Sequence, residues 1–138
     1  MGLRHTEDGR PLPRPNPTTQ PFFDAAREHR LVLQRCPRDG FFYYPRSRCP
    51  ACLGDDWTWE ECSGRGEVHS FTIDRIGHLP ALRALAPFAI AIVELDEGPR
   101  ITARLVDADV DEVAVGMPVE PAFEDVDGMT LVHFRPRS

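Results

Sequence analysis

The stretch Cys36-Pro37-Arg38-Asp39-Gly40, followed by Cys49-Pro50-Ala51-Cys52, contains two short turns of the kind that bind a metal ion. In the pattern C-x-x-C…C-x-x-C, the two cysteines of each turn face one ion, and two such turns complete a tetrahedral zinc site. Here an aspartate stands where the pattern has its second cysteine. We therefore predict a zinc-ribbon-like module with four candidate metal ligands, which are Cys36, Asp39, Cys49 and Cys52.

Whether zinc occupies this module is open on the sequence alone. Structural zinc sites use mainly Cys and His, so a set of three thiolates and one carboxylate is unusual and should bind zinc more weakly. Cys62 is a spare thiol that could replace Asp39, although its place after Trp59 fits a small buried residue better. In a ribbon without metal, an aromatic cluster would have to supply the packing: Phe41, Phe42, Tyr43, Tyr44, Trp57 and Trp59.

A catalytic zinc is a further alternative, because three ligands leave one position for water. Three thiolates would, however, reduce the Lewis acidity of the ion, and no H-E-x-x-H motif accompanies the cysteines. The sequence also lacks the G-x-S-x-G, P-loop and dinucleotide-binding motifs. We therefore predict no catalytic residues and do not expect the chain to be an enzyme alone.

Composition limits the size and the partners of the protein. Its 138 residues are enough for one domain or two small modules, and its 14 prolines favour short strands and turns. A net charge of −6 opposes nucleic-acid binding, which depends on clustered Lys and Arg. The sequence contains neither an apolar run of the ~20 residues that span a membrane nor an apolar secretory segment. We therefore expect no membrane partner and a cytoplasmic location.

The amino-terminal part divides into two segments. Residues 1–17 are rich in proline and are predicted to form an extended arm or linker. Residues 18–35 are predicted to form a short amphipathic helix followed by a strand. Because so short a helix is unstable alone, Phe22 and Phe23 must pack on this domain or on another subunit.

Residues 36–62 are the zinc-ribbon-like module, and residues 63–138 contain five predicted strands separated by turn signals. Five antiparallel strands, with a loop at residues 75–87, fit a Greek-key barrel of the OB type, and an SH3-like barrel is the nearest alternative. We expect the apolar second strand to be central. The predicted strands are Glu67–Ile73, Phe88–Leu95, Arg100–Val106, Met117–Glu124 and Thr130–Arg135.

Several motifs occur in an order that is typical of one family. They are Leu33-x-x-Cys36, Pro45-Arg46-x-x-Cys49-Pro50-x-Cys52, Ser63-Gly64-x-Gly66-x-Val68-x-Ser70-Phe71-Thr72, Val115-Gly116-Met117-Pro118-Val119 and Phe134-x-Pro136. From residue 18 onward, the sequence resembles the rubredoxin-like zinc-ribbon plus OB-fold family found beside thiolase-like enzymes. The resemblance implies a mainly β fold with a short N-terminal helix, a rubredoxin-like zinc ribbon and a five-stranded OB-fold barrel.

The resemblance also implies a function. Members of this family act as non-catalytic accessory subunits that dock on a thiolase-like acyl-CoA enzyme in a hetero-oligomer, stabilising it and helping to shape acyl-CoA access. Relatives also occur with a MaoC-type enoyl-CoA hydratase in steroid side-chain degradation, where the complex with a thiolase-like protein performs a retro-aldol cleavage. A CoA thioester is then the substrate of the complex. Of the four candidate ligands, Cys36, Cys49 and Cys52 match the family's pattern and Asp39 departs from it.

The residues also allow a different class of function. Zinc ribbons and OB barrels both bind single-stranded nucleic acids through aromatic stacking and basic grooves. The chain has the aromatic residues for such a module, but its charge is acidic. A single-stranded nucleic-acid-binding zinc-ribbon/OB module is therefore the alternative to the accessory subunit.

Overall fold

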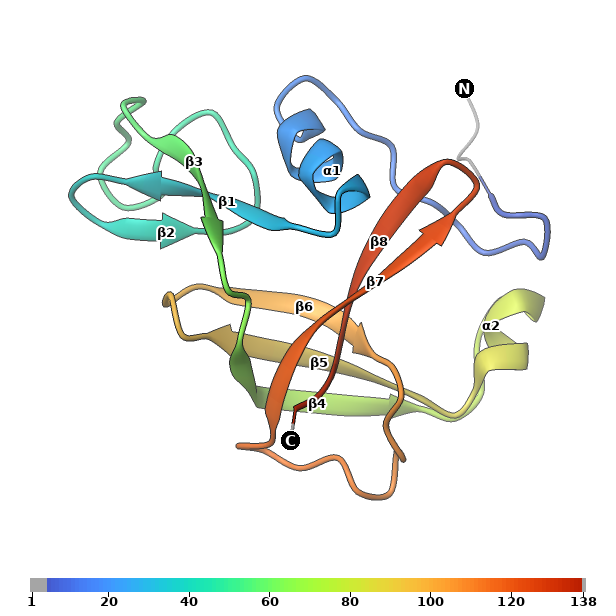
Figure 1. Cartoon of the computed structure of the whole chain (residues 1–138). Helices are drawn as coiled ribbons and strands as arrows, with labels where there is room; N and C mark the ends of the chain where they lie inside the picture. The colour runs from blue at the N-terminus through green and yellow to red at the C-terminus, as the bar shows by residue number, and fades with distance from the viewer. Residues whose placement is uncertain (1–4, 138) are drawn as a thin grey trace.

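Two sheets and two short helices make up the computed structural model, which describes residues 5–137 (Figure 1). The first sheet has the strand order β2-β1-β3, and the second is a closed barrel in the order β4-β5-β6-β8-β7. The elements are α1 (Gln20–Arg27), β1 (Leu31–Cys36), β2 (Gly40–Phe42), β3 (Thr58–Cys62), β4 (Gly66–Asp74), α2 (Pro80–Leu85), β5 (Phe88–Leu95), β6 (Arg100–Leu105), β7 (Pro118–Val126) and β8 (Met129–Pro136). The predicted mainly β fold, with a ribbon and an OB-like barrel, is confirmed.

The ribbon is built around β1, which pairs antiparallel with β2 on one side and with β3 on the other. The tight turn between β1 and β2 pairs Cys36 with Gly40. Gly40 has a φ of 82°, a left-handed conformation that glycine adopts without the steric cost of a side chain. This turn brings the end of β1 and the residue before β2 to the same end of the ribbon.

The barrel differs from the predicted all-antiparallel arrangement in one pairing. β4, β5 and β6 pair antiparallel, as do β7 and β8, but β6 and β8 pair parallel through Leu105 and Phe134. The connection between β6 and β7 passes along the lower end of the barrel in Figure 1 before β7 begins, so that β8 runs in the direction of β6. Short pairing between β4 and β7, at Gly66 and Val119, closes the barrel.

The predicted central strand, β5, pairs along its length with β4 and with β6. Although its sequence is apolar almost throughout, only alternate residues face the core, because successive side chains of a strand point to opposite sides. Ala89, Ala91, Val93 and Leu95 are buried, whereas Ile92 is exposed on the outer surface. The apolar run therefore provides both a core row and an outer apolar surface.

One hydrophobic core extends through α1, the ribbon and the barrel. Helix α1 packs against β1 and β8 and buries Phe22 and Phe23. These two rings belong to the same buried cluster as Leu33 of the ribbon and Val68 and Phe134 of the barrel. Phe22 and Phe23 therefore pack within this chain, which is the first of the two alternatives that the sequence left open.

The proline-rich arm lies against the barrel over its described residues. Leu12 is 4% exposed and joins the main core cluster. Arg10 donates two hydrogen bonds to the Glu124 carboxylate on β7, at 3.2 and 3.0 Å. The arm is therefore attached to the barrel at two points by residues that are distant in sequence.

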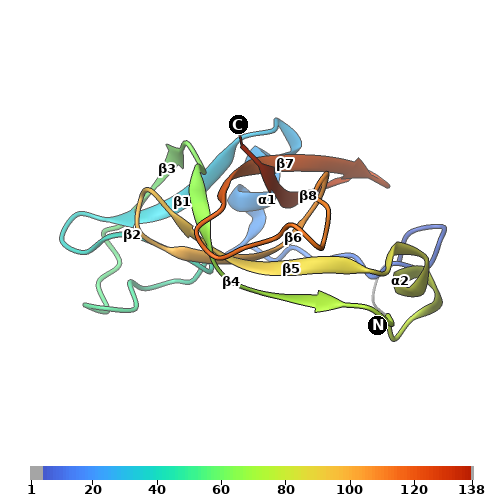
Figure 2. The same ribbon diagram turned by 90° about the horizontal axis from the view of Figure 1, so that it is seen from below.

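Residues 80–85, expected to lie in a loop, form the six-residue helix α2. Pro80 lies at its start, where a fixed φ and a missing N–H are tolerated. The helix lies at the opposite end of the barrel from the ribbon, as Figures 1 and 2 both show. Neither α1 nor α2, the helices of the described chain, is long and apolar enough to cross a membrane.

Candidate metal centre

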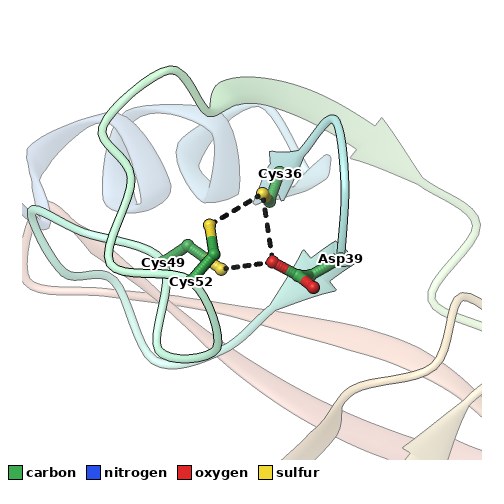
Figure 3. Close-up of side chains that lie close together, drawn as sticks. All are labelled: Cys36, Asp39, Cys49 and Cys52. Carbon is green, nitrogen blue, oxygen red and sulfur yellow. Dashed lines mark hydrogen bonds between the residues drawn. The ribbon is translucent and has the colours of Figure 1, made fainter.

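The structure brings the four predicted ligands together at the end of the ribbon (Figure 3). Cys36 ends β1 and Asp39 lies in the turn before β2, whereas Cys49 and Cys52 come from the connection between β2 and β3. One sulfur or oxygen atom from each of the four side chains lies within 4.8 Å of all the others. The Cys36 and Cys52 sulfurs are 3.7 Å apart, and Asp39 Oδ2 is 3.5 Å from Cys36 Sγ and 3.4 Å from Cys49 Sγ.

Backbone hydrogen bonds shape the second turn. The Leu53 N–H donates to the Cys49 carbonyl at 2.8 Å, and the Cys49 N–H donates to the Gly54 carbonyl at 2.9 Å. Leu53 has a φ of 62°, a left-handed conformation that turns the backbone sharply just after Cys52, and its side chain is exposed. Both sulfurs of this turn are thereby directed toward the turn that carries Cys36.

These separations fit a tetrahedral zinc ion. With Zn–S bonds of about 2.3 Å and a Zn–O bond of about 2.1 Å, the ligand atoms should lie about 3.8 Å apart for two sulfurs and about 3.6 Å for sulfur and oxygen. Three of the six separations, 3.7, 3.5 and 3.4 Å, are close to those values, and the other three are no longer than 4.8 Å. Cys36, Asp39, Cys49 and Cys52 would hold zinc as a closed, four-coordinate structural ion that links the two turns.

Cys62 lies outside this cluster. It is at the far end of β3, paired with Leu31, and its thiol donates a 3.5 Å hydrogen bond to the Leu31 carbonyl. Burial raises the pKa of the Cys62 thiol to about 12, which makes it a poor source of thiolate. Its position matches the expectation of a small buried residue and excludes it as a replacement for Asp39 in this arrangement.

The predicted aromatic cluster is divided between two cores. Phe42 and Trp57 pack with Cys36 and Cys49 beside the metal centre, with the two rings edge to face at 6.5 Å. The Trp57 indole N–H donates to the Ser47 carbonyl at 2.9 Å. Phe41, Tyr43 and Trp59 pack against the main core, and Tyr44 is exposed. Trp59 also contacts Trp57 edge to face at 5.9 Å, so it links the two cores.

Arg38 and Asp56 were not predicted to belong to the site. The Arg38 guanidinium donates to Asp56 at 2.6 and 2.9 Å and to Cys52 Sγ at 3.5 Å. The pKa of the Cys52 thiol is lowered, and the hydrogen bond from Arg38 is the largest cause. The pKa of the Asp39 carboxyl is also lowered by hydrogen bonds from the neighbouring thiols, and the largest of these effects comes from Cys52. The hydrogen bond from Arg38 favours the Cys52 thiolate that binds metal, whereas the contacts with Asp39 are made by protonated thiols and oppose their ionisation. The position of Arg38 between Cys36 and Asp39 was the one available sequence signal.

Comparison with known proteins establishes the family. Residues 23–58 match the family model described as the ChsH2 rubredoxin-like zinc ribbon domain, and residues 59–124 match that of the ChsH2 C-terminal OB-fold domain. A chain in a solved structure named Ltp2-ChsH2(DUF35) aldolase is 35% identical, with a TM-score of 0.79, and the match covers 91% of this chain and 98% of that one. The chain belongs to the DUF35 family.

Relatives of this DUF35 chain differ in length. A probable enoyl-CoA hydratase alpha subunit from Thermomonospora curvata is 36% identical over 129 residues, which are 92% of this chain and 40% of that protein. The benzoylsuccinyl-CoA thiolase subunit BbsA from Thauera aromatica is 28% identical over 105 residues, which are 73% of this chain and 71% of the relative. The DUF35 chain therefore spans less than half of the first relative and most of the second.

Proposed function

We propose that this chain is a non-catalytic accessory subunit of a thiolase-like acyl-CoA enzyme. The observation that carries the proposal is the likeness, over nearly the full length of both chains, to a chain of the structure named as an Ltp2-ChsH2(DUF35) aldolase. The relative from Thauera aromatica, named as a thiolase subunit, supports a partner of the thiolase type. Among the described residues, the one group of three or more potential metal ligands is the ribbon cluster, which has the geometry of a closed structural site.

The partner is proposed to dock on the outer surface of β4, β5 and β6. Ile90 and Ile92 of β5 lie opposite Thr72 and Ser70 of β4, and these four side chains are uncharged, whereas Arg104 and the Glu94–Arg100 pair lie at the edges of the surface. Thr102 of β6 lies on the other side of Ile92, and the surface is hollowed by about 270 Å³. Exposed apolar surface without charge is typical of the centre of protein interfaces. A thiolase-like enzyme is the occupant that the related complexes favour.

The more specific parts of the proposal concern substrate and context. We propose a CoA thioester as substrate of the complex, with retro-aldol cleavage of a steroid side chain as the reaction that the family resemblance favours. The hydratase name of the longer relative supports a physical link to a MaoC-type hydratase. In this assembly the ribbon would bind zinc as a structural ion, and the complex would work in the cytoplasm.

Single-stranded nucleic-acid binding has less support. The hollow on the outer surface of β4, β5 and β6 is lined mainly by isoleucine and hydroxyl side chains, and the aromatic residue in its lining, Phe71, packs against the main core. The net charge of −6 also opposes a phosphate backbone. Submicromolar, salt-sensitive binding of single-stranded oligonucleotides would revive this alternative.

Co-expression with the thiolase-like enzyme of the same organism tests the accessory role. We expect the two chains to co-purify and the partner to lose activity or solubility without this chain. Ile92→Asp should disrupt the complex, because it places a charge at the centre of the proposed surface. Val115→Asp is the matched control, since Val115 is an exposed apolar residue on the β6–β7 connection. A partner that is soluble and fully active alone would contradict the proposal.

A further inference from the structure

The metal centre has a buried side and a solvent side. Cys36 and Cys49 are each 1% exposed, whereas Asp39 and Cys52 are exposed. Water or a competing chelator therefore reaches the proposed zinc ion from the side of Asp39 and Cys52. That side also has the carboxylate, a ligand that structural zinc sites rarely use. Loss of the ion should begin there.

A second group of side chains covers this solvent side. Arg38 donates to the Cys52 sulfur at 3.5 Å, and Asp56 fixes the same guanidinium through contacts of 2.6 and 2.9 Å. Three thiolates and one carboxylate would leave a zinc site with a net charge of about −2, by formal charges. The positive charge of Arg38 partly offsets that charge, and its planar shape allows it to contact Asp56 and Cys52 together.

The space around Gly54 provides a separate observation on the contacts among Arg38, Asp56 and Cys52. A Cβ atom at position 54 would lie 2.6 Å from Arg38 Nη2, 3.0 Å from Asp56 Oδ1 and 3.3 Å from Cys52 Sγ. The three functional groups therefore converge over one residue that has no side chain. A methyl group there would have to displace the guanidinium from Cys52.

We propose that Arg38 and Asp56 form a clamp that positions Cys52 as a zinc ligand and slows the release of zinc from the solvent side. Arg38 acts through Cys52 and is a positioning residue, not a ligand. Removal of such outer partners of metal ligands typically costs 10–100-fold in metal affinity. The clamp offers a physical reason why a site with Asp39 in place of a thiol would retain a zinc ion. This inference rests on the proposed zinc occupancy of the ribbon and does not depend on the partner enzyme.

Zinc competition on the purified full chain tests the clamp. The zinc-loaded protein is titrated with the chromophoric chelator 4-(2-pyridylazo)resorcinol, which gives the dissociation constant and the release rate. We expect Arg38→Met to raise the zinc Kd by about 10–100-fold and Asp56→Asn to raise it by less. Arg35→Met is the matched control: Arg35 lies on the same ribbon, is as exposed as Arg38 (52% and 53%), and pairs with Glu60 instead of a metal ligand.

Two further measurements separate positioning from a general effect on folding. The metal-free Arg38→Met and parent proteins should unfold at nearly the same temperature, because an exposed ion pair such as Arg38–Asp56 contributes little to stability. Gly54→Ala should reproduce the faster release of zinc while keeping both clamp residues. The proposal is overturned if Arg38→Met and Arg35→Met bind zinc equally well, if metal-free Arg38→Met loses as much stability as the loaded form, or if the parent chain takes up no zinc.

Discussion

At position 39 a carboxylate stands among three thiols, and the backbone holds it where a fourth thiol would be. Asp39 lies in the turn after β1, where the expected cysteine would be, and its oxygen lies 3.4 and 3.5 Å from two of the sulfurs. One side chain has therefore changed the ligand chemistry while the turn geometry remains. This change should alter the affinity of the site for zinc, which variants of Asp39 can test.

Asp39→Cys should tighten zinc binding, because four thiolates are the ligand set that structural sites of this spacing prefer. We expect a decrease in the zinc Kd of at least about tenfold in chelator competition. Asp39→Ala should weaken binding, since it removes one ligand and leaves the turn intact. Equal affinities for the parent chain and Asp39→Ala would show that the carboxylate does not bind the ion.

Stability should fall as the solution becomes acidic because of Glu124 and His133, whose contact is 2.8 Å. The pKa of His133 is lowered, chiefly because the ring is buried. The unfolded chain therefore binds a proton at this histidine more readily than the folded chain. The free energy of unfolding decreases as pH falls below the usual histidine pKa of about 6.5. The hydrogen bond from Arg10, first of all, lowers the pKa of Glu124. The contribution of Glu124 to stability is therefore fully present above the usual carboxyl pKa. It is lost as pH falls through the lower pKa that Glu124 has in the folded chain.

Urea unfolding at several pH values between 7.5 and 5 checks the part of this dependence that belongs to His133. His133→Gln keeps a donor for Glu124 but cannot titrate, so it should lose less stability over this range than the parent chain. His69→Gln is the control, because His69 is exposed and weakly paired with Glu94 at 4.0 Å. An identical pH dependence in His133→Gln and the parent would contradict the assignment.

Among the elements, the arm shows how short segments gain structure from tertiary contacts. Leu12 is buried in the main core, so Leu12→Ala should lower the free energy of unfolding by about 2–5 kcal/mol. Leu53→Ala, at a position that is 66% exposed, should change it by less than about 0.5 kcal/mol. Chemical denaturation of the two variants measures both effects. A Leu12→Ala protein as stable as the Leu53→Ala protein would show that the arm is not part of the folded unit.

The elements also show how far the sequence could predict the fold. The barrel strands were predictable to within a few residues, because alternating apolar residues end at Gly, Pro and Asp turn signals. That Cys36, Asp39, Cys49 and Cys52 lie together was predictable from their spacing, and their binding of a metal ion stays a prediction. The attachment of Arg10 to Glu124 was not, because no local pattern relates residues 114 positions apart. Helix α2 was missed because its six residues are too few for a helical periodicity to appear.

In the whole molecule, two cores differ in what they depend on. The smaller core, with Phe42 and Trp57, packs directly on Cys36 and Cys49, whereas the main core extends from α1 to the barrel. Removal of zinc by a chelator should therefore speed amide hydrogen exchange in residues 36–57 and leave the protected amides of β5 and β8 unchanged. Hydrogen exchange with and without the chelator measures this. Uniform loss of protection would show that the ion supports the entire fold.

The continuous core that joins α1, the ribbon and the barrel has a consequence for inheritance. Because Phe22, Leu33 and Phe134 share one interior, neither module can be exchanged for a foreign version without matching side chains on the other. Recombination between the two halves would create mismatched interiors. The ribbon and the barrel should therefore be inherited together, whether this pair of modules stands alone or is joined to a longer polypeptide.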